Sequence, residues 1–263
     1  MNKAIKELKS AARETLLGNY GTLVGCYIIM DLLLSMTSSP LRILLQNAPV
    51  IPVWLYPVIV IMQLPLLFIA FILSGGWYYQ YLKLIRGQKP GMGDIFYFFR
   101  HDPLKCIQME LWLLLYLLPS FIPPVIGTIL LIALNASITG IVAFTLGIIT
   151  FIPISYSILF GASLIYYIFC DHPEYRARDI LKASFQLMKG QKLRLLILML
   201  SFLGFCLLGI VSFGLALLWA IPYLHATMAY FYKDLSENEK MEEKIDVIPA
   251  DSSGKYYTND YWL

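Results

Sequence analysis

Charged residues are scarce in this chain. Asp, Glu, Lys and Arg make up 14% of the 263 residues, against about 25% in an average soluble protein. Apolar residues account for 59%, and the mean hydropathy is +0.68. So few charges cannot cover the surface of a soluble domain, and we therefore expect the apolar surface to face lipid.

Catalytic signatures are missing as well. The sequence has no HExxH, GxSxG, Walker or dinucleotide-binding motif, so we expect neither enzymatic activity nor a cofactor. Its four cysteines lie in or beside apolar runs, and no disulfide framework is expected. Two Cys/His-containing segments, 101–106 and 170–172, are a weak alternative metal site. Without CxxC or HxxxH spacing we predict no metal.

Long apolar runs dominate what is present. A helix needs about 20 apolar residues to cross a membrane. The runs cover residues 20–36, 57–82, 107–133, 138–169 and 195–232. The last run is long enough for two spans joined near Gly209–Gly214. We predict an all-α, polytopic membrane helix bundle with six transmembrane spans over residues 1–234, followed by a disordered acidic cytosolic tail, 235–263.

The basic residues indicate how the chain is oriented. All of the Lys and Arg residues except Arg42 fall in segments that six spans would place on one side of the membrane. Cytosolic loops are enriched in Lys and Arg. We predict a bacterial plasma membrane protein whose N- and C-termini are both cytosolic, with a first span that is retained rather than cleaved.

Two cytosolic segments have the pattern of amphipathic interfacial helices. One covers the first 16 residues and the other Ala177–Lys189. Their basic residues predict contact with anionic lipid headgroups or with a membrane-protein partner, and not with nucleic acid. These residues are Lys3, Lys6, Lys9, Arg13, Arg178, Lys182, Lys189 and Lys192.

A weak internal repeat is a further possibility. Residues 75–105 and 161–192 each run from small residues through Tyr-Tyr and a basic loop to an Asp-Ile pair and a Lys. The two stretches would be copies of a unit that consists of a span, an interfacial helix and a span. The match is degenerate, and chance is the alternative explanation.

Three isolated polar residues lie within apolar runs. Asp31, deep in the first span, is either a proton or cation site or a carboxyl that hydrogen-bonds a neighbouring helix. His225, in the last span, lines a cavity or bonds across helices. Glu110 follows Lys105 closely, which favours the cytosolic interface. Prolines at 119, 123 and 124 are expected to kink the third span.

Both ends of the chain resemble one known family. At the N-terminus the segment is LKSAARETLLGNYG, and near the C-terminus it includes MKGQK, LSFLG, Trp219, Pro222-Tyr223 and AYFY at 229–232. These segments are similar to the family catalogued as domain of unknown function 975, integral membrane proteins mainly of Gram-positive bacteria. The resemblance implies a multi-span bundle and no established biochemistry.

Three hypotheses for function follow. The first is a non-enzymatic accessory or scaffold protein that docks partners through its cytosolic helices and tail. The alternative is a small transporter or lipid-handling protein with a cavity near Asp31, His225 and the proline-broken third span. An intramembrane enzyme comes last, because no pair of a nucleophile and a base is recognisable.

Overall fold

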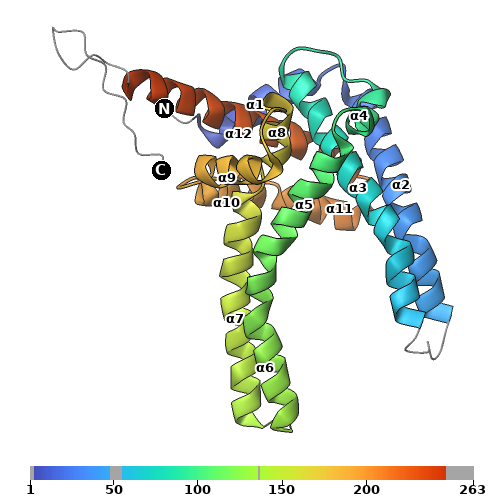
Figure 1. Ribbon diagram of the computed structural model, residues 1–263. Coiled ribbons are helices and arrows are strands. Elements are labelled where there is room, and N and C mark those ends of the chain that lie inside the picture. Colours follow the sequence, from blue (N-terminus) through green and yellow to red (C-terminus); the bar gives the residue numbers. More distant parts are fainter. Residues whose placement is uncertain (1–2, 48–54, 136, 247–263) are drawn as a thin grey trace.

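The computed structural model describes residues 3–47, 55–135 and 137–246, which form helices and turns without a strand (Figure 1). The helices are α1 (Ile5–Leu16), α2 (Tyr20–Asn47), α3 (Leu55–Ile85), η1 (Met92–Phe96), α4 (Tyr97–Arg100), α5 (Pro103–Leu117), η2 (Leu118–Phe121), α6 (Ile122–Ala133), α7 (Ile138–Gly161), α8 (Ile165–Asp171), α9 (Ala177–Leu187), α10 (Lys192–Leu200), α11 (Leu203–Val211) and α12 (Leu217–Asp246).

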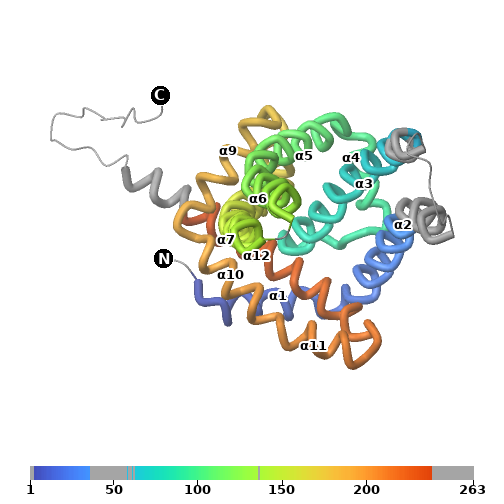
Figure 2. The backbone as a smooth tube through the Cα atoms, turned by 90° about the horizontal axis from the view of Figure 1, so that it is seen from below, coloured from blue at the N-terminus to red at the C-terminus, as the bar shows by residue number. Residues whose placement is uncertain are grey.

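Two helical hairpins project from a broader head (Figure 1). One hairpin is α2 with α3, and the other is α6 with α7. The head contains α1, η1, α4 and α8 to α12. Figure 2 views α6 and α7 nearly end-on, whereas α1, α10 and α11 are seen lengthwise. The head helices α1, α10 and α11 therefore run crosswise to the α6–α7 hairpin.

Glycines allow the two helices of the α6–α7 hairpin to pack backbone against backbone. A Cβ placed on Gly127 would lie 2.7 Å from Phe144 Cα, and one on Gly147 would lie 2.7 Å from Pro123 O. The hairpin turn is closed by Ser137, whose Oγ accepts from Gly140 N at the start of α7. Outward-facing side chains such as Ile129 and Ile149 are more than half exposed. This surface suits hydrocarbon rather than water.

Three stretches of the described residues are long and apolar enough to cross a membrane: Pro103–Ala133, Ile138–Asp171 and Lys192–Val211. Helices α1 and α2, bent by 95° between them, would form a fourth if the pair is one span. The prediction of six spans is therefore wrong.

The two ends of the chain account for most of the difference. The final apolar run is interrupted by a turn at Ser212–Ala216, and the uncharged part of α12 that follows, 217–232, is shorter than the about 20 apolar residues that a span needs. Helix α12 also stays helical as far as Asp246, past the predicted start of the tail. Side chains at the start of the predicted second span, and the residues from 247 onward, lie outside the described residues.

The core of the head is rich in aromatic residues from α3, α8 and α12. Tyr81, Tyr167 and Phe231 are almost fully buried. Tyr78 and Tyr166, which are the first tyrosines of the two predicted repeat segments, stack with their ring centroids 5.1 Å apart. Such pairs contribute about 0.5–1.5 kcal/mol beyond the burial of their area. This contact brings the two segments together, and their duplication remains a prediction.

Both predicted interfacial segments are helical, as α1 and α9, but their apolar faces are covered by protein. Leu8, Ala12 and Leu16 of α1 are buried, and α1 packs along α12. Ile180 and Leu181 of α9 are buried in the same way, in a helix that packs on α5 and α8. The interpretation that these apolar faces lie on the membrane is therefore corrected. Their polar faces, with Lys6 and Arg13 on α1 and Arg178 and Lys182 on α9, are exposed.

Candidate functional site

Asp31 and His225 line one cavity of about 350 Å³ between α2, α3 and α12. Its wall also includes the rings of Tyr27, Trp77 and Tyr78. Met30, Leu34, Ile221 and Leu224 supply apolar surface, and Ser74 supplies a hydroxyl. We call this space the Asp31 cavity. The structure thus brings together two residues that lie almost two hundred positions apart in the sequence.

Asp31 supplies a carboxylate at an exposed position of this cavity. The side chain is exposed, and the described residues provide no hydrogen bond or ion pair to it. Its neighbour Met30 is buried, so α2 turns one face toward the core and Asp31 toward the opening. A carboxylate without a protein partner is available to a ligand.

His225 belongs to the aromatic core. Its ring stacks on Tyr81 at 5.4 Å and meets the edges of Trp77 and Tyr78 at 5.5 and 5.6 Å. The residue is partly exposed, yet its Nδ1 atom is buried with no hydrogen-bond partner among the described residues. Burial lowers the pKa of the imidazole to about 4, so the ring is neutral at pH 7. We therefore assign it to the wall of the cavity rather than to a proton relay.

Glu110 does not join them. Its carboxylate accepts a 2.6 Å hydrogen bond from the hydroxyl of Tyr166, the ring that stacks on Tyr78. Lys105, the neighbour that suggested an interfacial position, instead pairs with Asp102 at 3.6 Å and donates to Pro173 O. Glu110 thus lies one aromatic ring behind the wall of the Asp31 cavity, directed into the protein.

The proline-broken segment also lies apart from the Asp31 cavity. Pro119 falls in η2, where the chain changes from α5 to α6, and Ser120 next to it is buried. The hydroxyl of Ser120 donates to Leu117 O and accepts from Ser155 of α7 at 3.1 Å. The break is therefore a packing contact with α7. We expected the proline-broken third span to line the same cavity as Asp31 and His225. The described lining of the Asp31 cavity contains no residue of that span.

The eight predicted basic contacts divide into two groups. Lys9 and Lys192 are engaged within the protein: Lys9 Nζ donates to Ser201 O and lies over the Phe202 ring, and Lys192 Nζ donates to Ser157. The other six are exposed on the head, namely Lys3, Lys6, Arg13, Arg178, Lys182 and Lys189. Lys3 also pairs with Glu237 at 3.8 Å, and Arg178 lies over the Trp112 ring. Lys6, Arg13, Lys182 and Lys189 are thus the predicted residues most accessible to headgroups or a partner.

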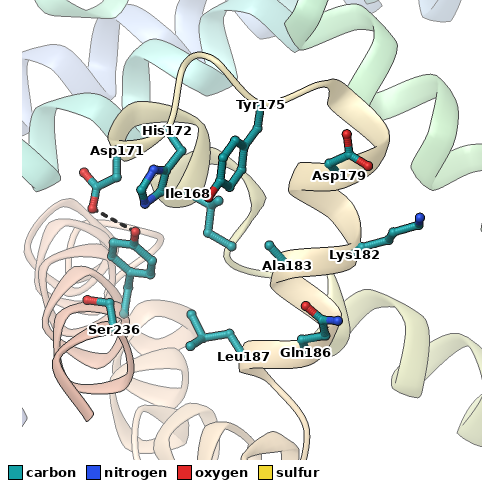
Figure 3. Close-up of a pocket in the computed structure, with 11 residues that line it drawn as sticks. Ile168, Asp171, His172, Tyr175, Asp179, Lys182, Ala183, Gln186, Leu187 and Ser236 are labelled. Atoms are coloured by element: carbon teal, nitrogen blue, oxygen red, sulfur yellow. Dashed lines mark hydrogen bonds between the residues drawn. The ribbon is translucent and has the colours of Figure 1, made fainter. Parts of the chain in front are cut away.

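A second, polar pocket of about 380 Å³ lies between α8, α9 and α12 (Figure 3). Its lining includes Asp171, His172, Asp179 and Lys182. The Asp171 carboxylate is neutralised by Arg86 and accepts a 2.8 Å hydrogen bond from Tyr232, drawn as the dashed line. Burial and this carboxylate raise the pKa of the Tyr232 hydroxyl.

Beside this pocket, His172 and Glu174 form an exposed hydrogen-bonded contact. His172 Nδ1 lies 3.1 Å from a Glu174 oxygen, and the His172 ring stacks on Tyr175. A backbone hydrogen bond and the bond to His172 lower the pKa of the Glu174 carboxyl. Sequence analysis placed Asp171 and His172 only in a weak metal hypothesis. No group of three or more His, Cys, Asp or Glu residues in the described ranges could hold a metal ion.

One buried ion pair was not recognised from the sequence. Asp234 on α12 is 3% exposed and accepts a 2.5 Å hydrogen bond from Arg194 on α10. The same carboxylate accepts from the backbone N–H of Lys3, and Arg194 also donates to Lys3 O. The N-terminus, α10 and α12 are therefore joined through two charges. Lone charges at the ends of apolar runs resemble solvated loop residues, so the sequence carried no signal for this pair.

Comparisons with known proteins identify the family. A search of curated proteins and a search of solved structures each found no match. The family described as protein of unknown function (DUF975) matches residues 1–239, which includes every helix through the buried end of α12. The resemblance at the two ends of the sequence is thereby confirmed. This chain belongs to the DUF975 family.

Proposed function

We propose that this protein is a non-enzymatic, multi-pass protein of the bacterial plasma membrane that binds a small membrane-dissolved molecule in the Asp31 cavity, as a transporter or lipid-handling protein. The observation that carries the proposal is the meeting of Asp31 and His225 in one cavity of about 350 Å³. Ligand sites are typically concave, mostly apolar and supplied with a few polar groups. The Asp31 cavity has these three properties.

We propose a topology in which the two hairpins cross the membrane and the head, with its exposed basic residues, lies at the membrane surface. Figure 1 places α1, α9 and α12 at the end of the molecule opposite the α6–α7 turn. The exposed Lys and Arg residues of α1 and α9 therefore gather at one end, which the basic-residue rule assigns to the cytosol. With α2, α3, α5–α6 and α7 as the crossing helices, both termini belong to that same side.

The surroundings of the histidines support a role without covalent catalysis. In the described part of the chain, His101 contacts the Tyr97 carbonyl and His172 contacts Glu174. His225 is enclosed by aromatic rings. None of them is hydrogen-bonded to a serine or cysteine, the arrangement that would activate a nucleophile.

Gentle extraction followed by native mass spectrometry tests the proposal. Wild-type protein is expected to retain a lipid or small molecule in stoichiometric amount. Ser74 lines the Asp31 cavity and donates its hydroxyl to Ala70 O of its own helix; replacing it by leucine should remove that molecule by filling the space. Glu14→Gln, on an exposed position of α1, is the matched control and should retain it.

Two outcomes would count against ligand binding. Ligand binding is contradicted if the wild-type protein carries no bound molecule, both when it is extracted from membranes and when it is reconstituted in lipid. Equal retention by wild type and the Ser74→Leu variant would place the bound molecule elsewhere on the protein.

A second candidate is the accessory or scaffold role, favoured by the polar pocket of Figure 3. This pocket lies on the head, and Ser236 in its wall is close to the point where the acidic tail follows. Truncation after Ser236 should then abolish co-purification of a protein partner, while Ser74→Leu should not. If the ligand binds in the Asp31 cavity, Ser74→Leu should lose the retained small molecule and the truncated protein should keep it.

A further inference from the structure

The walls of the Asp31 cavity have a composition that selects a particular ligand. Three large aromatic side chains line it, from Tyr27 on α2 and from Trp77 and Tyr78 on α3. The Tyr27 and Trp77 rings lie 5.9 Å apart and are tilted by 54°. Trp77 and Tyr78 in turn flank His225. Rings from three different helices thus line one open hollow.

The charge of this cavity has one sign. Among the described residues, Asp31 is the only acidic residue in the lining and no Lys or Arg lines it, and the imidazole of His225 is uncharged at neutral pH. Asp31 also has no partner among the described residues. An anionic ligand, such as a phosphate or a carboxylate, would therefore meet repulsion without a compensating cation.

The wall of this cavity is mainly apolar and aromatic. Its polar groups are the Asp31 carboxylate, the hydroxyls of Tyr27 and Tyr78, the His225 ring and Ser74, whose hydroxyl already donates to Ala70 O in its own helix. A sugar or a peptide carries more hydrogen-bonding groups than these could satisfy, at about 1–3 kcal/mol for each buried group left unpaired. An alkyl chain would instead contact Met30, Leu34, Ile221 and Leu224.

We propose that the Asp31 cavity binds the ammonium group of an alkylammonium compound. Aromatic faces attract organic cations through the ring quadrupole, which is how aromatic cages hold quaternary ammonium groups. Asp31 supplies the counter-charge, and the four aliphatic side chains supply contact for the alkyl chain. This inference rests on the proposed function and specifies its ligand class.

Titration calorimetry on purified protein in phosphatidylglycerol nanodiscs tests the proposal, because that lipid carries no ammonium group. Three probes share one chain length: hexyltrimethylammonium, hexan-1-ol and hexanoate. Hexyltrimethylammonium is expected to bind at least about tenfold more tightly than the other two, because only the cation gains cation–π contacts and attraction to the Asp31 carboxylate.

The variants separate the aromatic rings from the carboxylate. Asp31→Asn should weaken binding of the cation by about tenfold and leave the weak binding of hexan-1-ol unchanged. Tyr27→Phe keeps the ring and should bind like wild type, whereas Tyr27→Leu should weaken binding several-fold. Tyr27 is only half-buried, so both variants are expected to fold; Glu14→Gln is the control.

The outcomes distinguish this inference from the proposed function. If hexan-1-ol binds as tightly as the cation, with no loss in Asp31→Asn, the cavity binds apolar molecules in general; the ammonium assignment fails and the proposed function stands. Preference for hexanoate would also overturn the assignment. If no probe binds and the native protein retains no molecule, both proposals fail together.

Discussion

The α6–α7 hairpin and the head are packed in opposite ways. In the hairpin, glycines bring two backbones into contact and the large aliphatic side chains point outward. In the head, aromatic rings and several polar groups are buried, among them Gln80, Asp234 and Thr227. Aliphatic groups outside and polar groups inside are the arrangement expected where lipid replaces water.

This difference has a consequence for where ligands bind. At Gly127, Gly140 and Gly147 the two helices of the hairpin meet backbone to backbone, and the pockets described above use the head and the roots of the hairpins. The head also holds the buried charges, because Asp234 and Arg194 can satisfy one another there. We therefore expect the hairpin to be an anchor, and the head to determine stability and binding.

The most damaging change should be loss of the buried ion pair in the head. Asp234→Leu leaves Arg194 without its carboxylate, and breaking a buried pair typically costs about 3–5 kcal/mol. A marked fall in the unfolding temperature in detergent is expected. The double variant Asp234→Leu with Arg194→Met should recover much of it. Glu237→Gln, from an exposed ion pair, should change stability by about 1 kcal/mol or less. If Asp234→Leu and Glu237→Gln lower the unfolding temperature equally, the buried ion pair does not stabilise the head more than an exposed one.

A charge on the outward face of the hairpin tests its contact with lipid. Ile149 in α7 is 58% exposed, so Ile149→Lys creates no buried clash in the protein itself. In a membrane, a central Lys costs about 2.5–3.5 kcal/mol. We expect Ile149→Lys to reduce the membrane-inserted fraction, measured by flotation and protease protection. Ser10→Lys on the exposed face of α1 should insert normally. Normal insertion of both variants would mean that the hairpin lies outside the hydrocarbon.

Contact between the backbones of α6 and α7 should be sensitive to the smallest side chains. A Cβ on Gly127 would meet Phe144 Cα and Ala143 O at 2.7 and 2.8 Å, and backbone cannot rotate away. Gly127→Val should therefore cost about 1–3 kcal/mol as the helices separate. Distances between spin labels on the two helices would show that separation. Gly204→Ala in α11 has nothing within 4 Å and should leave stability equal or higher. If the distances between the spin labels are the same in Gly127→Val as in the wild type, close packing of the two backbones is contradicted.

The sequence predicted the helices and the candidate residues better than their arrangement. Apolar runs located α2, α5–α6 and α7, and the glycines near 209–214 located the break before α12, where Phe213 and Gly214 adopt positive φ. Asp31 and His225 were identifiable because each interrupts an apolar run. Their meeting depends on how α2 and α12 pack against α3, which no local pattern encodes.

The same limit explains the errors in topology. A run of apolar residues such as Lys192–Val211 has the length of a span whether it crosses the bilayer or runs crosswise to the hairpins, as in Figures 1 and 2. The apolar face of α1 has the same spacing whether it contacts lipid or α12. Only the tertiary structure separates these alternatives.

Per pH unit, the smallest expected effect is a pH dependence of the head that the hairpin lacks. In the folded protein the pKa of His225 is about 4, against about 6.5 in an unfolded chain, so the unfolded state binds more protons between these values. Stability should be full above pH 6.5 and fall toward pH 4, by about 1 kcal/mol per pH unit at most. His225→Phe keeps an aromatic ring among Trp77, Tyr78 and Tyr81 and cannot take up a proton. Subtracting its unfolding temperatures from those of wild type at each pH removes the shared contribution of the carboxylates. A difference that does not vary with pH would place the His225 ring in contact with water rather than in the aromatic core.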